Sequence, residues 1–300
     1  MAKVSYKIYI QAIIANIFWG FSFVWTDIVL KANIPPITLV SARMIIATIL
    51  LGIWAKYTGN LQKIKYKHLK YFLGLAICEP FLYFLCETYG QTMVSPTVAS
   101  VIVATIPLFT PIVGFLILKE KIGKATIIGI IVSMIGVLTV VFVGSHDLSG
   151  QFIGAILIFG AVIAALGYAV FVKYIVSRYN ATTLVFYQNL IGLLFFTPCF
   201  FIVDFSHLGD MKLTFAAVSS IIQLSVFASV IAFIFYSRAV KELGVTKAGV
   251  FCYIIPVLTA LFAFFMVDEK LVILQWIGMI VVIFGLFLSQ FVGRKSQETD

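Results

Sequence analysis

The chain has 300 residues, of which 62% are hydrophobic and only 11% are charged. Soluble globular proteins carry about 25% charged residues, so this composition excludes an ordinary soluble protein and indicates a chain that folds in lipid. The formal net charge of +9 does not indicate a nucleic-acid partner, because the basic residues lie in short segments between apolar stretches and follow the charge rule of membrane proteins.

Ten apolar stretches are long enough to cross a bilayer as helices, which takes roughly 20 residues each. In chain order they are 9–29, 36–56, 70–91, 96–118, 124–143, 151–173, 181–203, 214–237, 246–266 and 271–292. The main polar interruptions are 59–70 and 204–212. These stretches are continuously apolar, so the alternating pattern of a membrane β-barrel is a weak alternative. We therefore predict an all-α membrane protein with ten transmembrane helices.

The basic residues predict the orientation of the spans. With a cytoplasmic N-terminus, 17 of the 21 lysines and arginines lie on the cytoplasmic side, while Lys31, Lys212 and Lys270 lie outside and Arg43 lies within the second span. The first stretch lacks a small-residue cleavage site followed by a soluble domain, so it is interpreted as a span and not as a signal peptide. The positive-inside rule thus predicts a multi-pass protein of the cytoplasmic (inner) membrane with both termini in the cytoplasm. The cytoplasmic set is Lys3, Lys7, Lys56, Lys63, Lys65, Lys67, Lys70, Lys119, Lys121, Lys124, Lys173, Arg178, Arg238, Lys241, Lys247, Arg294 and Lys295.

The chain contains an internal repeat. Shifting it by 149 residues aligns 97–142 with 246–291, and about 15 of these 46 positions are identical. The matches include Ile106-Pro107 with Ile255-Pro256, Glu120-Lys121 with Glu269-Lys270, and Gly129 and Gly136 with Gly278 and Gly285. Apolar composition alone does not produce these paired motifs. We predict two five-helix repeats, 1–145 and 146–300.

Five spans is an odd number, so the second repeat enters the membrane from the opposite side. Inverted repeats are typical of secondary transporters, whose substrate sites lie near the bilayer midplane between the repeats. This step from architecture to function is an analogy.

Several motifs together resemble the drug/metabolite transporter superfamily, in particular its EamA-type ten-helix branch. They are the aromatic-glycine start of the first span (Phe18-Trp19-Gly20-Phe21-Ser22), Ser41-Ala42-Arg43, and Ala99 followed by Pro107 and Lys119-Glu120-Lys121, with their repeat in the second half. The resemblance covers residues 8–292. It implies a ten-helix carrier with internal duplication, commonly an exporter of amino acids or other small metabolites, and it does not name the substrate.

Arg43, Glu79 and Glu87 are the candidate charged residues of a site. A charge inside the bilayer is costly and needs a partner, water or a substrate. Arg43 can clamp a carboxylate or phosphate with its planar fork of donors, or form a fixed ion pair that locks the second and third spans. Glu79 precedes Pro80, which kinks the helix, and it is the candidate for proton coupling. The alternative for Glu79 is a glutamate that only lines a cavity.

Neutral and aromatic residues complete the candidate substrate site. Gln188 and Asn189 occupy the second-half stretch that corresponds to Arg43, either to bind the substrate or to bond neighbouring helices. Trp19 and Tyr83 are the preferred aromatic candidates, since aromatic rings bind apolar side chains or ammonium groups. Other aromatics that are expected mostly to face lipid or the interface are Trp25, Tyr89, Tyr168, Tyr187, Tyr236 and Tyr253.

Prolines and glycines mark candidate structural positions. Pro107, Pro111 and Pro256 are expected to interrupt the fourth and ninth spans at corresponding depths, and Pro107 and Pro256 are candidate gating kinks. For any one proline, a simple packing kink is the alternative. The small-residue faces at Gly129, Ser133, Gly136, Gly278 and Gly285 predict close helix packing, with a homodimer as an alternative.

No motif predicts an enzyme, a cofactor or a metal site. The sequence has no GxxxxGK[ST] loop of an ATP-driven pump, no HExxH and no GxSxG. His68, His146 and His207 lie in separate loops, which makes zinc binding an unlikely role. The four cysteines, Cys78, Cys86, Cys199 and Cys252, lie inside apolar stretches and are expected to act as small packing residues.

We therefore expect a secondary transporter that exports amino acids or similar metabolites by alternating access, with proton coupling as an option. Its expected partners are a small-molecule substrate and the lipid bilayer. The nearest alternative is an antiporter of nucleotide sugars or sugar phosphates, which would need several basic residues in its cavity where only Arg43 is visible. A membrane enzyme or a channel is less well supported.

Overall fold

The protein is folded as ten consecutive helical spans in the computed structural model, which describes residues 5–118, 123–143 and 147–289. Within these ranges, nine segments are long and apolar enough to cross a membrane, and a tenth, α14, is apolar but shorter. This confirms the all-α membrane fold. In chain order the helices are α1 (Tyr6–Lys31), α2 (Pro36–Thr58), η1 (Tyr66–His68), α3 (Leu69–Ala76), η2 (Ile77–Leu82), α4 (Tyr83–Gln91), α5 (Pro96–Val103), α6 (Ile106–Leu118), α7 (Lys124–Phe142), α8 (Leu148–Ile175), α9 (Ala181–Cys199), η3 (Phe200–Asp204), η4 (Phe205–Asp210), α10 (Phe215–Gln223), η5 (Leu224–Ala232), α11 (Phe233–Leu243), α12 (Val245–Gly249), η6 (Val250–Ile254), α13 (Ile255–Val267) and α14 (Ile273–Phe287).

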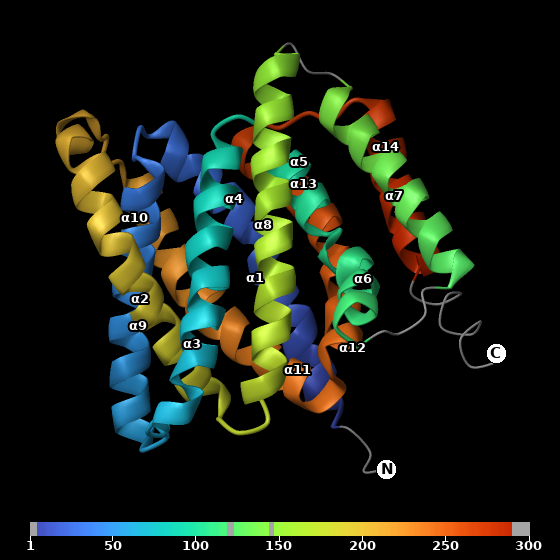
Figure 1. Ribbon diagram of the computed structural model, residues 1–300. Coiled ribbons are helices and arrows are strands. Elements are labelled where there is room, and N and C mark those ends of the chain that lie inside the picture. Colours follow the sequence, from blue (N-terminus) through green and yellow to red (C-terminus); the bar gives the residue numbers. More distant parts are fainter. Residues whose placement is uncertain (1–4, 119–122, 144–146, 290–300) are drawn as a thin grey trace.

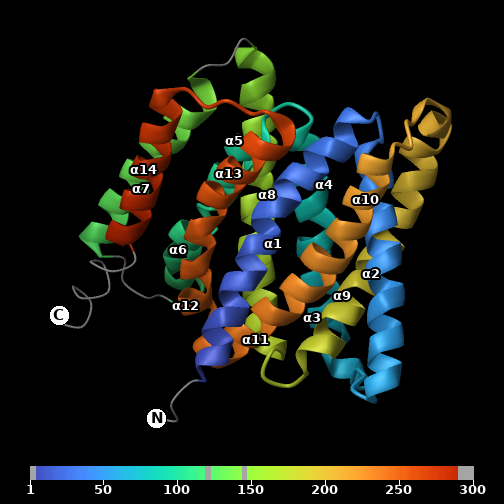
Figure 2. The ribbon, with the colours of Figure 1, turned by 180° about the vertical axis from the view of Figure 1, so that it is seen from behind.

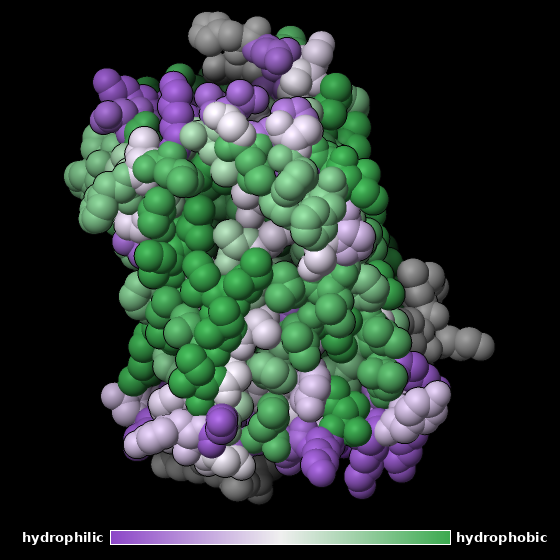
Figure 3. Space-filling model, turned by 90° about the vertical axis from the view of Figure 1, so that its left-hand side faces the viewer, coloured by the Kyte–Doolittle hydropathy of each residue, from purple (hydrophilic) through white to green (hydrophobic). Residues whose placement is uncertain are grey.

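The surface has an apolar band between two polar ends. Figure 3 shows hydrophobic residues across the middle of one face and hydrophilic residues at its top and bottom. Large apolar side chains such as Ile163, Ile202 and Phe265 are 69%, 82% and 74% exposed, which is the arrangement expected of a surface in contact with lipid. The start of α1 and the end of α14 lie at the same end of the molecule (Figures 1 and 2), as an even number of spans requires.

Three spans are broken at the predicted prolines. Glu79 has a non-helical backbone (φ −148°, ψ 117°) just before Pro80, so the third span consists of α3, η2 and α4. The fourth span breaks at 104–105, between α5 and α6, just before the Ile106-Pro107 pair, and in the ninth span a 3-10 segment precedes α13 and Pro256. Pro111 is different, because it lies inside α6 without ending it. The paired breaks at Pro107 and Pro256 therefore follow the repeat.

The segment 204–212 was expected to be a polar loop, and this expectation is wrong for most of it. The seventh span continues through η3 and η4 to Asp210. Asp204 is only 2% exposed, and its Oδ2 accepts bonds from the backbone N (2.6 Å) and the Oγ1 (3.0 Å) of Thr38. The acid thereby satisfies donors in the first turn of α2, whose N-cap residue Pro35 makes no side-chain cap bond. Asp204, which was expected in a loop, therefore bonds the seventh span of the second half to α2 of the first half.

The halves meet in a seam between α7 and α14. An atom added as Cβ at Gly129 would lie 2.5 Å from the carbonyl oxygen of Gly285, and one at Gly136 would lie 2.6 Å from that of Gly278. Under the 149-residue shift Gly129 corresponds to Gly278 and Gly136 to Gly285, so the contacts are crossed, as they are across a two-fold axis. Ser133 Oγ donates to the carbonyl oxygen of Val282, its own counterpart, at 3.0 Å. A residue that bonds to its counterpart lies at the axis, which supports two inverted repeats.

The seam also accounts for the small-residue faces. The predicted close packing occurs within one chain, where α7 and α14 cover each other (Figure 1). The homodimer stays a prediction, and it has to use another surface because these glycines are already covered.

Some predictions fall on residues outside the described ranges. The orientation count includes Lys3, Lys119, Lys121, Arg294 and Lys295, the repeat includes Glu120, and the proposed division of the repeats lies at 145/146, next to His146. Those parts of the predictions stay untested.

Candidate functional site

A cavity of about 100 Å³ lies between the two halves. Its walls come from α1, α2, the broken third and fourth spans, α8, α11 and the segment from α12 to α13, so each half contributes to it. It is lined by Trp19, Ser22, Phe23, Arg43, Glu79, Tyr83, Phe84, Glu87, Val103, Ile106, Pro107, Thr110, Ala165, Tyr168, Ala169, Val172, Phe233, Tyr236, Val240, Val245, Thr246, Gly249, Cys252 and Ile255.

Arg43 links the first half to the second. It is 4% exposed, its Nε donates to Ser229 Oγ in η5, and its guanidinium carbon lies 4.1 Å from the ring centroid of Phe84. Among the residues that the structure describes, Arg43 forms no direct ion pair with Glu79 or Glu87. The arrangement is thus a buried cation held by a hydroxyl and an aromatic face, and not an ion pair that locks the second and third spans.

Glu79 and Glu87 both line the cavity but differ in their surroundings. Glu87 is 4% exposed and accepts a bond from Gln91 Nε2 at 3.0 Å, one turn along α4. Glu79 lies at the helix break and is partly exposed. Glu79 is therefore the carboxylate better placed to meet a ligand.

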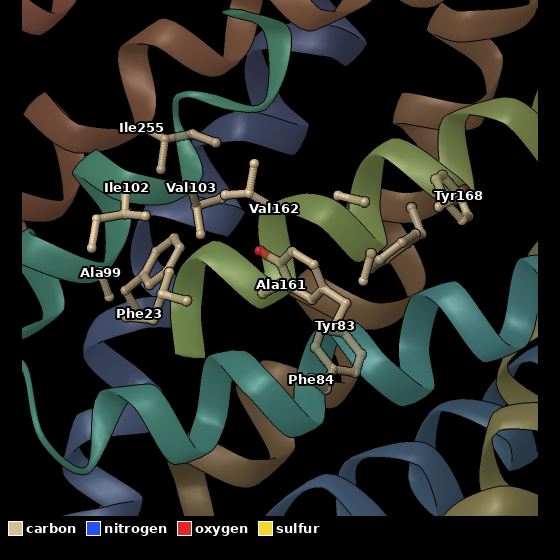
Figure 4. Packing of buried hydrophobic residues seen from close by; sticks show 14 of the residues in the cluster. Phe23, Tyr83, Phe84, Ala99, Ile102, Val103, Ala161, Val162, Tyr168 and Ile255 are labelled. Atoms are coloured by element: carbon tan, nitrogen blue, oxygen red, sulfur yellow. The ribbon is translucent and has the colours of Figure 1, made fainter. Parts of the chain in front are cut away.

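Aromatic side chains share the cavity wall with Glu79. Tyr83 and Trp19 lie in the wall as predicted, and the ring of Trp19 is 4.9 Å from that of Tyr236. Tyr168 and Tyr236 line the same cavity. Figure 4 shows Tyr83 on α4 and Tyr168 on α8 with the apolar residues packed around them. The cavity wall thus combines an acid with several aromatic rings.

Four predicted site residues have different placements. Pro107 lines the cavity, whereas Pro256 is buried beside it at the start of α13. Gln188 and Asn189 are 1% and 3% exposed in α9, and neither belongs to the cavity wall. Asn189 Nδ2 bonds to the carbonyl oxygen of Val185, four residues earlier in its own helix, at 2.8 Å. The structure thus brings Trp19, Arg43, Glu79, Tyr83 and Glu87 together, and it leaves Gln188 and Asn189 outside.

The two ends of the cavity differ. At the end where α1 begins, the wall reaches Val240, Val245 and Thr246 around the turn from α11 to α12. At the opposite end, Glu269 Oε2 accepts bonds from the Oγ1 (2.8 Å) and the backbone N (3.3 Å) of Thr97, which is fully buried. Among the described residues, the cavity wall thus reaches the end at α11 and α12, whereas the bonds between Glu269 and Thr97 lie at the other end.

Comparison with known proteins assigns the family. The model of the EamA-like transporter family matches this chain twice, over residues 6–142 and 152–291. The chain belongs to the EamA-like transporter family. It is therefore a multi-pass membrane transporter, as the resemblance of its motifs predicted.

Individual relatives agree with this family. An "Uncharacterized transporter" of Archaeoglobus fulgidus is 27% identical over 273 residues, which is 90% of this chain and 94% of the relative. The "Uncharacterized transporter YetK" of Bacillus subtilis is 27% identical over 70% of this chain, and that match spans 64% of YetK, slightly under two thirds of its length. A solved crystal structure with 15% identity covers 97% of this chain and 98% of its own with a TM-score of 0.71, and it supports the fold alone.

Sequence reasoning missed several wall residues of this EamA-like transporter. Tyr168 and Tyr236 were expected mostly at lipid or interface positions, and Cys252 was expected only to pack between helices, yet all three line the cavity. The repeat held one signal. When a two-residue gap is allowed in the 149-residue shift, Gly167 aligns with Gly20, and Tyr168 falls in the stretch that corresponds to the aromatic-glycine motif of α1. Nothing comparable marked Tyr236 or Cys252.

Proposed function

We propose that this protein is a secondary transporter that exports amino acids or similar small metabolites across the cytoplasmic membrane by alternating access. The observation that carries the proposal is the cavity itself, which holds one arginine and two glutamates between two inverted repeats. Charged groups inside a bilayer are costly and mark substrate or ion pathways. A site between inverted repeats can be exposed to either side when the repeats exchange conformations.

The charges favour this substrate class over phosphorylated ones. Within the described lining Arg43 is the one basic residue, accompanied by Glu79 and Glu87. A sugar phosphate or nucleotide sugar brings at least one further negative charge, which two carboxylates would repel. The cavity therefore supports a zwitterionic or cationic solute better than an anionic one.

Direction and coupling are part of the same proposal. We propose that both termini are cytoplasmic, in line with the distribution of basic residues. With this orientation, the end of the cavity at Val245 and Thr246, where α1 begins, is the end that faces the cytoplasm, which is in line with loading from inside. Glu79 is the proposed proton-coupling residue, since it is a carboxylate in the wall at a helix break.

The test is transport by purified protein in lipid vesicles. Radiolabelled amino acids, nucleosides and organic acids are offered with and without a pH gradient, and accumulation or exchange of at least one solute is expected. Glu79→Gln should abolish gradient-driven accumulation while retaining exchange, because it removes the titrating group and keeps the shape of the side chain. Gradient-driven transport that survives unchanged in this variant contradicts proton coupling at Glu79. An ion conductance without carriage of any solute contradicts the carrier function as a whole.

A further inference from the structure

We propose that the cavity recognises its solute through an ammonium group, bound by Glu79 within the ring formed by Trp19, Tyr83, Tyr168 and Tyr236. The amine is then the required part of the ligand, and a carboxylate is dispensable. This inference rests on the proposed carrier function and specifies its substrate class as amines with an apolar body, including amino acids but not organic acids.

The balance of charge in the wall is the first argument. Three charged side chains belong to the described lining, and two of them are acidic. One of the two acids is therefore left without an equivalent cation. Glu87 is buried and accepts a bond from Gln91, whereas Glu79 is partly exposed in the wall, so Glu79 is the acid that a ligand can reach. A cationic group completes the charge balance there, whereas an anion would add to the imbalance.

The engagement of Arg43 is the second argument. A guanidinium that serves as a carboxylate clamp needs its donors directed at the ligand. Here Nε is already bonded to Ser229, and the guanidinium carbon lies 4.1 Å from the centroid of the Phe84 ring. Arg43 is thus held in place by η5 and α4, and its Nε donor is already used.

The surroundings of Glu79 are the third argument. Glu79 lies at the break of the third span and is partly exposed in the cavity wall, whereas Glu87 already accepts a bond from Gln91. Tyr83, Tyr168 and Tyr236 line the same cavity, and the ring of Trp19 lies 4.9 Å from that of Tyr236. A carboxylate and the faces of aromatic rings both attract an ammonium group, and the ring faces repel anions.

The experiment compares ligands that share one body. For an aromatic and an aliphatic body, three compounds are measured: the primary amine, the amino acid and the carboxylic acid without an amino group. Binding to wild-type protein in detergent is measured by calorimetry, and exchange is measured in vesicles. The amine and the amino acid should bind, and the acid should bind at least about tenfold more weakly, since it loses the contacts with the carboxylate and the rings.

Two variants locate the effect. Glu79→Gln should reduce the preference for the amine over the acid by roughly tenfold or more, while Glu242→Gln, at an exposed position of α11, should leave the preference unchanged. A thermal melt of each variant shows whether it is folded. The comparison of ligands on the wild-type protein does not depend on the folding of either variant.

The outcomes separate this inference from the carrier function. Exchange of any acid that lacks an amine, at the rate of its amine counterpart, overturns amine recognition but leaves a working carrier. A preference for the amine that persists in Glu79→Gln overturns the assignment to Glu79. If no solute is exchanged, the carrier function itself fails, and the inference fails with it.

Discussion

The seam between α7 and α14 obeys the internal two-fold symmetry. The pair of helix starts at α5 and α12 does not. In the seam both copies of each contact are present, as Gly129 meets Gly285 and Gly136 meets Gly278. At the helix starts the copies differ, since Thr97 is fully buried whereas its counterpart Thr246 is partly exposed and lines the cavity. One region is symmetric and the other is not.

This difference indicates which parts move. When two inverted repeats exchange conformations, a contact that already obeys the two-fold axis is the same before and after. Corresponding positions that differ in burial, such as Thr97 and Thr246, must exchange their surroundings. The seam is therefore expected to stay fixed during transport, and the ends of α5 and α12 are expected to open and close in turn.

The largest expected effect comes from breaking the symmetric region. Gly136→Val places a Cβ 2.6 Å from the carbonyl oxygen of Gly278 and 2.7 Å from the backbone nitrogen of Val282. Backbone atoms cannot move away from the added Cβ as the end of a flexible side chain can, so the two helices must separate. We expect a loss of about 3 kcal/mol in stability, measured by thermal unfolding in detergent.

The control for this prediction is Gly209→Val. A Cβ at Gly209 meets no atom within 4 Å, so this variant should unfold at the wild-type temperature. Equal melting of Gly136→Val and wild type would mean that α7 and α14 are not closely packed in the membrane.

The second effect concerns a position where the halves differ in charge. Arg43→Leu leaves Glu79 and Glu87 without their cation, and we expect a loss of about 2–3 kcal/mol together with loss of transport. Gln188→Leu, in the corresponding stretch of α9, removes an amide whose Oε1 is buried without a hydrogen-bond partner among the described residues. Its stability should be unchanged or slightly higher, by about 1 kcal/mol.

Transport assays on the same two variants sharpen the comparison. Gln188 does not belong to the cavity wall, so Gln188→Leu should transport at close to the wild-type rate. If it is inactive while folded, the amide reaches the substrate in a state other than the one described, and the binding role expected from the sequence is restored.

The sequence predicted the features of this fold that arise from local physics. Span positions follow from apolar runs, the inversion follows from an odd number of spans per repeat, and the breaks at Pro80, Pro107 and Pro256 follow from a missing N–H donor. It also brought Arg43 and Glu79 into one candidate site, because charges in apolar runs are rare.

Contacts between distant positions were not predictable in this way. Ser229, which holds Arg43, is a serine among other small residues of η5. Asp204 was predicted to lie in a loop, because its partner, Thr38, lies 166 positions away in the sequence. Tyr236 and Cys252 face the cavity because of the rotation of their helices about the helix axis. An apolar run without a polar face does not predict this rotation.

The smallest effect tests the asymmetric helix starts through Glu269. This residue lies outside the spans, between α13 and α14, and burial raises the pKa of its carboxyl group, although the bonds from Thr97 act in the opposite direction. A raised pKa means that the closed end binds the proton more tightly than an unfolded or open end does. The contribution of Glu269 to closure is therefore complete at pH below the ordinary glutamate value of 4.5 and is lost as the pH rises through the raised value.

The measurement is thiol labelling of Ser100→Cys, a fully buried position of α5, in protein whose four native cysteines are replaced. The ratio of labelling in wild-type Glu269 to labelling in Glu269→Gln, taken at each pH, cancels the intrinsic pH dependence of the thiol. This ratio should rise with pH by up to about fivefold, the equivalent of a capping interaction of about 1 kcal/mol. Thr246→Cys, at the other helix start, should show a fall over the same pH range, because opening one end closes the other. A rise at both positions would mean that Glu269 stabilises the whole fold and not one end of the cavity.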